Sequence, residues 1–181
     1  MAGGQEFAEE LDYITSRNIG NDMSVAFTKE EDSEAAASHL PDRPISTHPN
    51  LVTAAGLAQL DAALASAKEA VALAQANLDL KTDRSAMARA LRDLRYFTAR
   101  RASAQLVDPD GAPGTVLFGR QVCFRREDGR IQSFRIVGED EADPAQGSVS
   151  YISPIAKSLL GKKVGELATL GNAELEIVSV D

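Results

Sequence analysis

Two carboxylates, Asp79 and Asp83, stand four residues apart in the stretch NLDLKTDRSA, which spans residues 77–86. On a helical turn this spacing places both side chains on one face, where they can share an ion. Carboxylates bind Mg²⁺ while leaving it several waters, and such an ion can activate a water for attack on a phosphodiester. The pair is therefore a candidate metal-bearing tip, with a solvated bend between two helices as the alternative.

A helix rich in arginine follows this pair and holds a single acid, Asp93. Four of its arginines form a candidate basic stripe, Arg84, Arg89, Arg92 and Arg95, which Arg100 and Arg101 extend. A stripe of this kind suits contact with RNA or with a charged protein wall. The alternative is a solubilising face whose arginine stems lie over the helix seam.

The remaining reactive side chains predict no catalytic site. Cys123 is the only cysteine and has no histidine near it in sequence, so we expect a packed thiol rather than a nucleophile. His39 and His48 both fall in a Pro-rich stretch. The acidic run GEDEADPAQG, residues 138–147, lacks the ligand spacing of a calcium loop, and we expect a solvated turn between strands. We assign no catalytic residue and expect no enzyme activity.

The net charge of −8 is spread unevenly along the 181 residues. Residues 1–50 carry 3 Lys/Arg against 10 Asp/Glu, residues 51–108 carry 8 against 6, and residues 109–181 carry 8 against 11. The acidic total argues against a general duplex-DNA binder, which needs many cationic phosphate contacts. No apolar run approaches the ~20 residues of a membrane span, and the start lacks a signal-peptide pattern. We therefore expect a cytoplasmic protein without a membrane partner.

The spacing of apolar residues predicts how the first two parts of the chain are organised. Residues 1–50 are acidic and rich in Ser and Pro, which is typical of a flexible arm. From Thr53, a helix cap, apolar residues recur in steps of three and four, and they do so again after the bend. Residues 51–108 should thus form an antiparallel coiled-coil hairpin whose first helix covers 54–80. Its predicted seam contains Leu57, Leu60, Leu64, Ala67, Val71, Ala74 and Leu78, then Met87, Leu91, Leu94, Phe97, Ala102 and Leu106.

In residues 115–181 the apolar residues recur at every second position instead. Apolar residues alternate on both sides of the Asp128-Gly129 turn, which indicates a β-hairpin. A third strand follows at GSVSYI, then a two-turn helix with Ser153 as its cap and Pro154 at its first position. ELATLGNAELEIVSV gives a second hairpin. The expected fold is α+β, a helical hairpin followed by a small antiparallel sheet with one short helix.

These stretches resemble one known family. VLFGRQVCFRREDGRIQSFRIVGEDEADPAQGSVSYISPIAKSLLGKKVGE is similar to the C-terminal domain of the bacterial Gre transcript-cleavage factors (GreA/GreB). LVTAAGLAQL and LRDLRYFTARRASAQLVD resemble the helices of that family's coiled coil. The resemblance implies an FKBP-like domain that docks on RNA polymerase, and a coiled coil that carries an acidic tip down the secondary channel to the catalytic magnesium. It implies a polymerase-docking corner at Ser150, Ile152, Ser153 and Pro154, although Ile152 stands where some members have an acid.

The tip departs from the family pattern. Residues 79–81 match it, whereas Leu78, Thr82 and Asp83 stand where the family has Gly, a second acid and Asn. The hairpin also looks about two turns shorter, or ~11 Å at 5.4 Å per turn. We therefore expect a short-hairpin member whose tip occupies the channel without stimulating RNA cleavage. No intrinsic cofactor is implied, and any Mg²⁺ would be shared with the polymerase.

The expected function is that of an RNA polymerase-binding transcription elongation regulator acting through the secondary channel. Nascent RNA is a further expected contact, and no small-molecule substrate is expected. One alternative is a polymerase-binding regulator of the nucleoside diphosphate kinase regulator type, which shares the C-terminal domain on a shorter hairpin. Another is a prolyl isomerase, suggested only by the FKBP-like fold. Its aromatic pocket would have to come from Phe118, Phe124, Phe134 and Tyr151.

Overall fold

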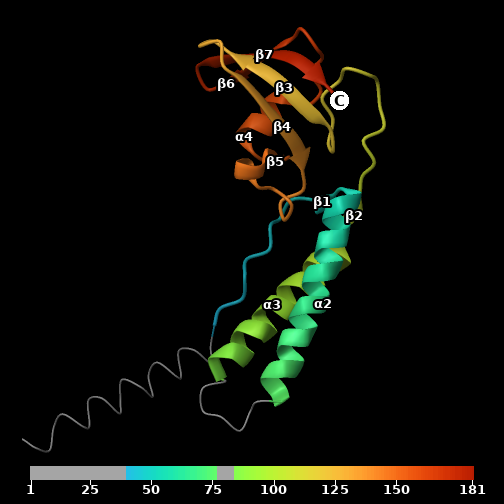
Figure 1. The fold of residues 1–181 in the computed structure, drawn as a ribbon, viewed down its shortest axis with the longest axis vertical. Coiled ribbons are helices and arrows are strands. Elements are labelled where there is room, and N and C mark those ends of the chain that lie inside the picture. The colour runs from blue at the N-terminus through green and yellow to red at the C-terminus, as the bar shows by residue number, and fades with distance from the viewer. Residues whose placement is uncertain (1–39, 77–83) are drawn as a thin grey trace, which may run out of the picture. The chain divides into compact units, whose positions relative to one another are not determined.

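The computed structural model describes residues 40–76 and 84–181. Within them a helical hairpin precedes a five-stranded sheet (Figure 1). The predicted tip residues Asp79 and Asp83 lie outside the described residues, as do residues 1–39 of the predicted arm. No helix in the described part of the chain is both long and apolar enough to cross a membrane.

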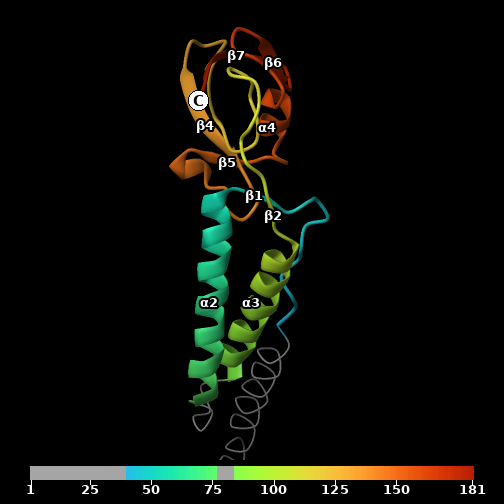
Figure 2. The same ribbon diagram turned by 90° about the vertical axis from the view of Figure 1, so that its right-hand side faces the viewer.

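The hairpin consists of α2 (Ala54–Ala76) and α3 (Arg84–Ser103), which pack side by side in both ribbon views (Figures 1 and 2). α2 begins where the sequence predicts. The Thr53 hydroxyl accepts a hydrogen bond from the Gly56 amide at 3.0 Å and caps the first turn. Four predicted seam residues of α2 are buried, namely Leu60, Ala67, Val71 and Ala74. Residues 77–80 of the predicted first helix fall outside the described residues.

The predicted seam of α3 is partly wrong. Ala90 is buried, whereas the predicted Leu91 is 37% exposed, and Ala102 and Leu106 are exposed as well. Ala90 and Leu91 both fit a spacing of three or four along the helix, so periodicity alone could not separate them. Ala90 lines the same groove as Ala74 of α2, so the helices meet here through small side chains.

Two short strands, β1 (Leu51–Val52) and β2 (Gln105–Leu106), pair in parallel at the base of the hairpin. The Val107 amide also donates to the Val52 carbonyl at 3.0 Å. The start of α2 and the end of α3 are therefore tied together by backbone hydrogen bonds. The sequence did not predict these strands, because two residues are too few to show alternation.

The sheet has the strand order β5-β4-β3-β7-β6. Its strands are β3 (Gln121–Arg126), β4 (Ile131–Val137), β5 (Ser148–Ser150), β6 (Leu167–Leu170) and β7 (Ala173–Val180). Both predicted hairpins are confirmed, since β3 pairs antiparallel with β4 and β6 with β7. The prediction of a wholly antiparallel sheet is wrong, because β5 lies parallel to β4. The connection between them, which includes the 3-10 helix η2 (Pro144–Gln146), brings the chain back along β4 before β5 begins.

The short helix α4 (Pro154–Leu159) packs on this sheet. Its predicted cap is confirmed, since the Ser153 hydroxyl accepts the Ala156 amide at 3.3 Å and Pro154 occupies the first position. Ala156 and Leu159 are fully buried in a core with strand residues that include Val122, Phe124, Ile136, Leu175 and Ile177. All buried members of this core fall within 116–177, so the hairpin contributes none of them.

Arg120 fastens the segment that leads into the sheet domain. Its guanidinium donates five hydrogen bonds of 2.9 to 3.3 Å to the carbonyls of Pro109, Gly111, Ala112 and Thr115. These bonds use all five N–H donors of the side chain. The turn-rich stretch DPDGAPG, which separates hairpin and sheet in the sequence, is therefore held against the sheet domain.

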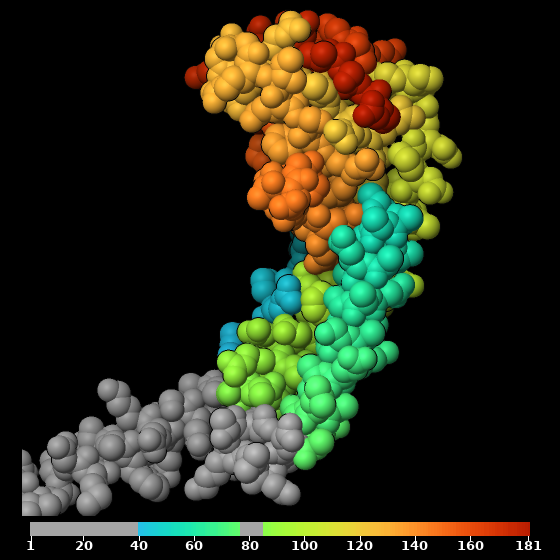
Figure 3. Space-filling model, viewed as in Figure 1, coloured from blue at the N-terminus to red at the C-terminus, as the bar shows by residue number. Residues whose placement is uncertain are grey.

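Residues 40–50, the end of the predicted arm, lie beside α3 without forming a helix or strand (Figure 3, blue beside green). The Arg43 guanidinium lies 3.7 Å from the centre of the Tyr96 ring and 3.5 Å from the Asp93 carboxylate. Asp42 pairs with Arg95 at 2.6 Å. We call residues 42–50 the strap, because these contacts hold them against α3.

Candidate functional site

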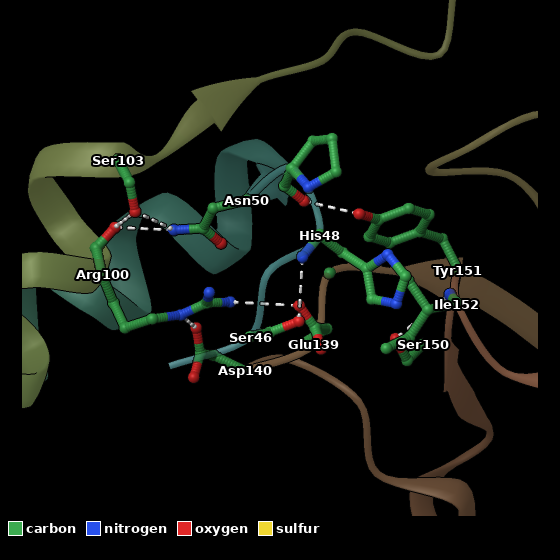
Figure 4. Close-up of polar contacts among 12 residues, drawn as sticks. Ser46, His48, Asn50, Arg100, Ser103, Glu139, Asp140, Ser150, Tyr151 and Ile152 are labelled. Atoms are coloured by element: carbon green, nitrogen blue, oxygen red, sulfur yellow. Dashed lines mark hydrogen bonds and ion pairs between the residues drawn. The ribbon is translucent and has the colours of Figure 1, made fainter. Parts of the chain in front are cut away.

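Three consecutive acids, Glu139, Asp140 and Glu141, follow β4 and contact the base of the hairpin (Figure 4 shows the first two). We call them the acidic loop. The sequence predicted a solvated turn over residues 138–147. Residues 143–146 are exposed as predicted, but the prediction is wrong for the three carboxylates of the acidic loop. The side chains of Glu139 and Asp140 are only 19% and 15% exposed, and both contact Arg100 of α3.

Glu141 binds the N-terminal end of α2. Its Oε1 atom accepts the Thr53 amide at 2.8 Å and the Gly138 amide at 3.2 Å, while Oε2 accepts the Thr53 hydroxyl at 2.5 Å. The Thr53 hydroxyl in turn accepts the Gly56 amide, so cap and carboxylate form one chain of hydrogen bonds. A negative charge at this end of a helix is also stabilised by the helix dipole, typically by about 0.3 to 1 kcal/mol.

Two glycines make room for this carboxylate. A Cβ atom on Gly56 would overlap the carboxyl group of Glu141, and one on Gly138 would overlap the Leu51 carbonyl. Inside a helix, glycine is less favourable than alanine by about 1 kcal/mol. The close approach of Glu141 accounts for the glycine at position 56.

Arg100 of α3 meets the other two acids of the loop. Its side chain is 2% exposed, its Nε donates to Asp140 Oδ2 at 2.5 Å, and its Nη2 lies 3.8 Å from Glu139 Oε2. Asn50 of the strap donates to the Arg100 carbonyl at 2.7 Å. Removing one partner of a buried pair is strongly destabilising, by about 3 to 5 kcal/mol. Arg100 is therefore a buried, paired residue and does not extend the basic stripe.

Two tyrosines border the acidic loop. Tyr96 of α3 donates its hydroxyl to Asp140 Oδ1 at 2.6 Å, and Tyr151 donates to the Pro49 carbonyl of the strap at 2.5 Å. Burial raises the pKa of Tyr96, and the hydrogen bond and negative charge of Asp140 raise it further. Burial also raises the pKa of Tyr151, with the charge of Glu139 adding to the effect. Both hydroxyls therefore stay protonated, and able to donate, to a higher pH than an ordinary tyrosine.

The predicted docking corner lies at the end of β5. Ser150, Ile152 and Ser153 are half-buried, and Pro154 is exposed. The Ser153 amide donates to the Ser150 carbonyl at 2.9 Å, and α4 starts directly afterwards. Tyr151, within the corner, is anchored to the strap (Figure 4). The corner is therefore a surface with a fixed backbone.

The predicted basic stripe is partly neutralised. Arg95 pairs with Asp42 of the strap, and Arg92 lies 3.6 Å from Asp93. Arg89 is exposed and donates to a serine hydroxyl of its own helix. Outside the described residues lie the side chain of Arg84 and both tip residues, Asp79 and Asp83.

The structure joins residues that the sequence analysis did not connect. Arg100 and Asp140 are 40 positions apart, and Thr53 and Glu141 are 88 apart, so no local pattern links them. One signal was available. Gly56 stands in the first turn of an alanine-rich helix, where an unfavourable glycine indicates a close approach by another group.

Comparison with known proteins identifies the family. The family model described as "Transcription elongation factor, GreA/GreB, C-term" matches residues 111–181. Transcription elongation factor GreB of Neisseria meningitidis serogroup B is 42% identical over an alignment of 96 residues, which covers 50% of this chain and 59% of that protein. Transcription elongation factor GreA of Methylococcus capsulatus is 39% identical over an alignment of 127 residues, which covers 62% of this chain and 79% of that protein. The chain belongs to the GreA/GreB family.

This membership covers more than the sheet domain. An alignment of 127 residues is longer than the 71-residue match to the GreA/GreB C-terminal domain, so it takes in part of the hairpin. The match to GreB spans somewhat more than half of that relative's length. Among solved structures, GreA factor homolog 1 (Gfh1) of Thermus thermophilus matches 74% of this chain and 99% of that one, with 21% identity and a TM-score of 0.35.

Replacing Gly56 with Ala should destabilise the protein by about 1 to 3 kcal/mol, although the same change in an exposed helix stabilises by about 1 kcal/mol. The new methyl group displaces Glu141 from Thr53, so their charge-assisted hydrogen bonds are lost. Urea unfolding of wild type, Gly56→Ala, Glu141→Ala and the double variant measures the effect. With Glu141 truncated, Gly56→Ala should become stabilising. A Gly56→Ala change that stabilises the wild-type background would contradict this account.

Raising the pH above about 10 should weaken the contact between Tyr96 and the acidic loop. Because the pKa of Tyr96 is raised in the folded protein, its contribution to stability is complete below the unfolded-state pKa and is lost as the pH rises through the folded-state value. The free energy of unfolding should therefore fall between about pH 9 and pH 12, more steeply in wild type than in Tyr96→Phe. Tyrosinate absorbance can follow the ionisation, because the chain has three Tyr and no Trp. Equal slopes in the two proteins would show that another group is responsible.

Proposed function

We propose that this chain binds RNA polymerase and regulates transcript elongation, with its hairpin entering the secondary channel. The observation that carries the proposal is the 39% identity to GreA over 127 residues, which includes part of the hairpin. The architecture supports it, because the hairpin contributes no buried residue to the sheet core and can enter an opening while the sheet domain stays outside. With such a partner, we propose a cytoplasmic location.

The docking corner is the surface that we propose for the first contact with the polymerase. Its backbone is fixed by the turn between Ser150 and Ser153 and by the start of α4 at Pro154, so binding requires little ordering. Ile152 presents an apolar side chain within this polar corner. Its replacement by a charged residue is therefore the most direct way to disturb the contact.

The proposed action is binding rather than catalysis. A prolyl isomerase would need an open aromatic pocket in the sheet domain. Instead, Phe118 packs edge-on against Tyr151 with ring centroids 5.9 Å apart, and Phe124 lies against Phe134 at 6.1 Å. Phe118 and Phe124 are buried, so these rings form core packing and do not favour the isomerase alternative.

At the tip we propose occupation of the channel without stimulated RNA cleavage. Asp79 and Asp83 are the two carboxylates that could share a Mg²⁺ with the polymerase, but Thr82 stands where the family has its second acid. A loosely bound Mg²⁺ depends on its few protein ligands for its position. Arg89 and Arg92 would then strengthen binding in the channel by facing RNA or the channel wall.

Replacing Ile152 with Arg should weaken polymerase binding by roughly 10-fold or more, because a charge must be desolvated at the docking corner. A pull-down with core RNA polymerase measures the change. Leu167→Arg is the matched control, since Leu167 is an apolar residue of β6 that is 51% exposed. Unchanged recovery of Ile152→Arg would mean that the docking surface lies elsewhere.

Wild type, Asp79→Asn and Asp83→Asn should all leave the RNA of a backtracked polymerase complex uncut. All three should still compete with an authentic cleavage factor for the channel, and competition should weaken when Arg89 and Arg92 are changed to Gln. Gel analysis of labelled RNA at fixed Mg²⁺ gives both readouts. Cleavage by wild type that disappears in each Asn variant would overturn this expectation and make the pair a metal-bearing tip.

A further inference from the structure

The hairpin and the sheet domain meet through polar contacts on two separate helices. Glu141 binds the start of α2, and Asp140 together with Glu139 binds Arg100 near the end of α3. The buried sheet core lies within 116–177, so apolar packing in that core does not fix the hairpin. Two directional contacts on two helices oppose rotation about either one.

We propose that the acidic loop fixes the direction of the hairpin relative to the sheet domain. Glu141 and Arg100 are then positioning residues for the contacts that the far end of the hairpin makes. This inference rests on the proposed function, in which the hairpin enters the polymerase channel. Neither residue has to touch the polymerase. Each acts through the direction that it gives to α2 or α3.

The length of α2 makes its direction important. Its 23 residues span roughly 34 Å at 1.5 Å per residue. A tilt of about 10° at the base therefore moves the far end by roughly 6 Å. A polar contact is already lost when its atoms separate beyond about 3.5 Å. A small change at the acidic loop is enough to remove contacts made by the far end of the hairpin.

The chemistry of the joint suits positioning. A buried ion pair is often no more stabilising than packed apolar side chains of the same size. Charge-assisted hydrogen bonds, however, have a defined geometry that apolar contacts lack. Arg100 is 2% exposed beside two acids, and Gly56 and Gly138 leave room for Glu141 to reach Thr53. These features all favour one fixed geometry.

Spin labels can measure the direction of the hairpin without the polymerase. A Cys123→Ser background removes the only cysteine, and Leu73→Cys on α2 with Leu167→Cys on β6 places one label on each part. The two leucines are 65% and 51% exposed, so the labels disturb little packing. Pulsed electron paramagnetic resonance should give one narrow distance distribution. The narrow distribution should be lost in Glu141→Ala and in Arg100→Met.

Glu176→Ala is the matched control, because Glu176 is an acid of β7 whose ion-pair partner is Arg125 within the same sheet. It should keep the narrow distribution. Circular dichroism checks that each variant retains its helices. If Arg100→Met loses helix content, Glu141→Ala, which removes no buried charge from α3, decides the test.

The same variants are then compared as competitors of an authentic cleavage factor on RNA polymerase. Glu141→Ala should need roughly 10-fold more protein for equal displacement, because the displaced far end of the hairpin loses about one charge-assisted hydrogen bond to the polymerase, while Glu176→Ala behaves as wild type. An unchanged distance distribution in Glu141→Ala would overturn the proposal, as would a broadened distribution with unchanged competition. If wild type does not bind the polymerase, the proposed function fails. The spectroscopy then still decides whether the loop fixes the hairpin.

Discussion

The carboxylate of Glu141 joins the hairpin to the sheet domain, whose buried core contains no hairpin residue. It accepts the amide and the hydroxyl of Thr53 from the hairpin and the amide of Gly138 from its own loop. The side chains at two positions of α2 and its cap suit this contact. Thr53 both caps α2 and donates to the carboxylate, and Gly56 leaves the space that any larger residue would fill. One acid is therefore matched by the residue types at two positions far away in the sequence, 53 and 56.

The arginines of α3 have different roles although they stand on one helix. Arg100 is buried against two acids, so its pairing is little affected by salt. Arg95 and Asp42 form a pair in which both side chains are exposed, and salt at physiological strength screens such a pair. The strap thus neutralises Arg95 in a pair that salt can screen, whereas the acidic loop neutralises Arg100 in a buried pair that salt screens little. The charge that α3 presents to a partner is correspondingly smaller than its arginine content implies.

Local signals were enough to predict most elements of the fold. Thr53 and Ser153 cap their helices as expected, and the Asp128-Gly129 turn joins an antiparallel pair of strands. Errors arose where the outcome depends on distant partners. Parallel pairing of β5 with β4 follows from the path of a ten-residue connection, and the burial of Ala90 in place of Leu91 follows from the facing helix.

The candidate site was harder to predict for the same reason. The backbone of the proposed docking corner could be predicted, because a cap, a proline and a strand end mark it locally, whereas its docking role comes from the family resemblance. The acidic loop looked like a solvated turn, since its partners Thr53 and Arg100 lie 88 and 40 positions away. Charge composition alone cannot distinguish a solvated acid from one paired across the fold. Gly56, an unfavourable residue in a helix, was the single local sign of that contact.

The hydrogen bonds of Arg120 have a consequence for how firmly the joint stays closed. Val107 is bonded to Val52 of the hairpin and Pro109 to Arg120 of the sheet domain, so Asp108 alone separates the two points of attachment. With so short a tether, the acidic loop meets its hairpin partners at an effective concentration in the millimolar range or above. Contacts that would be weak between separate molecules are then sufficient, because a joint that opens can reclose without a diffusional search.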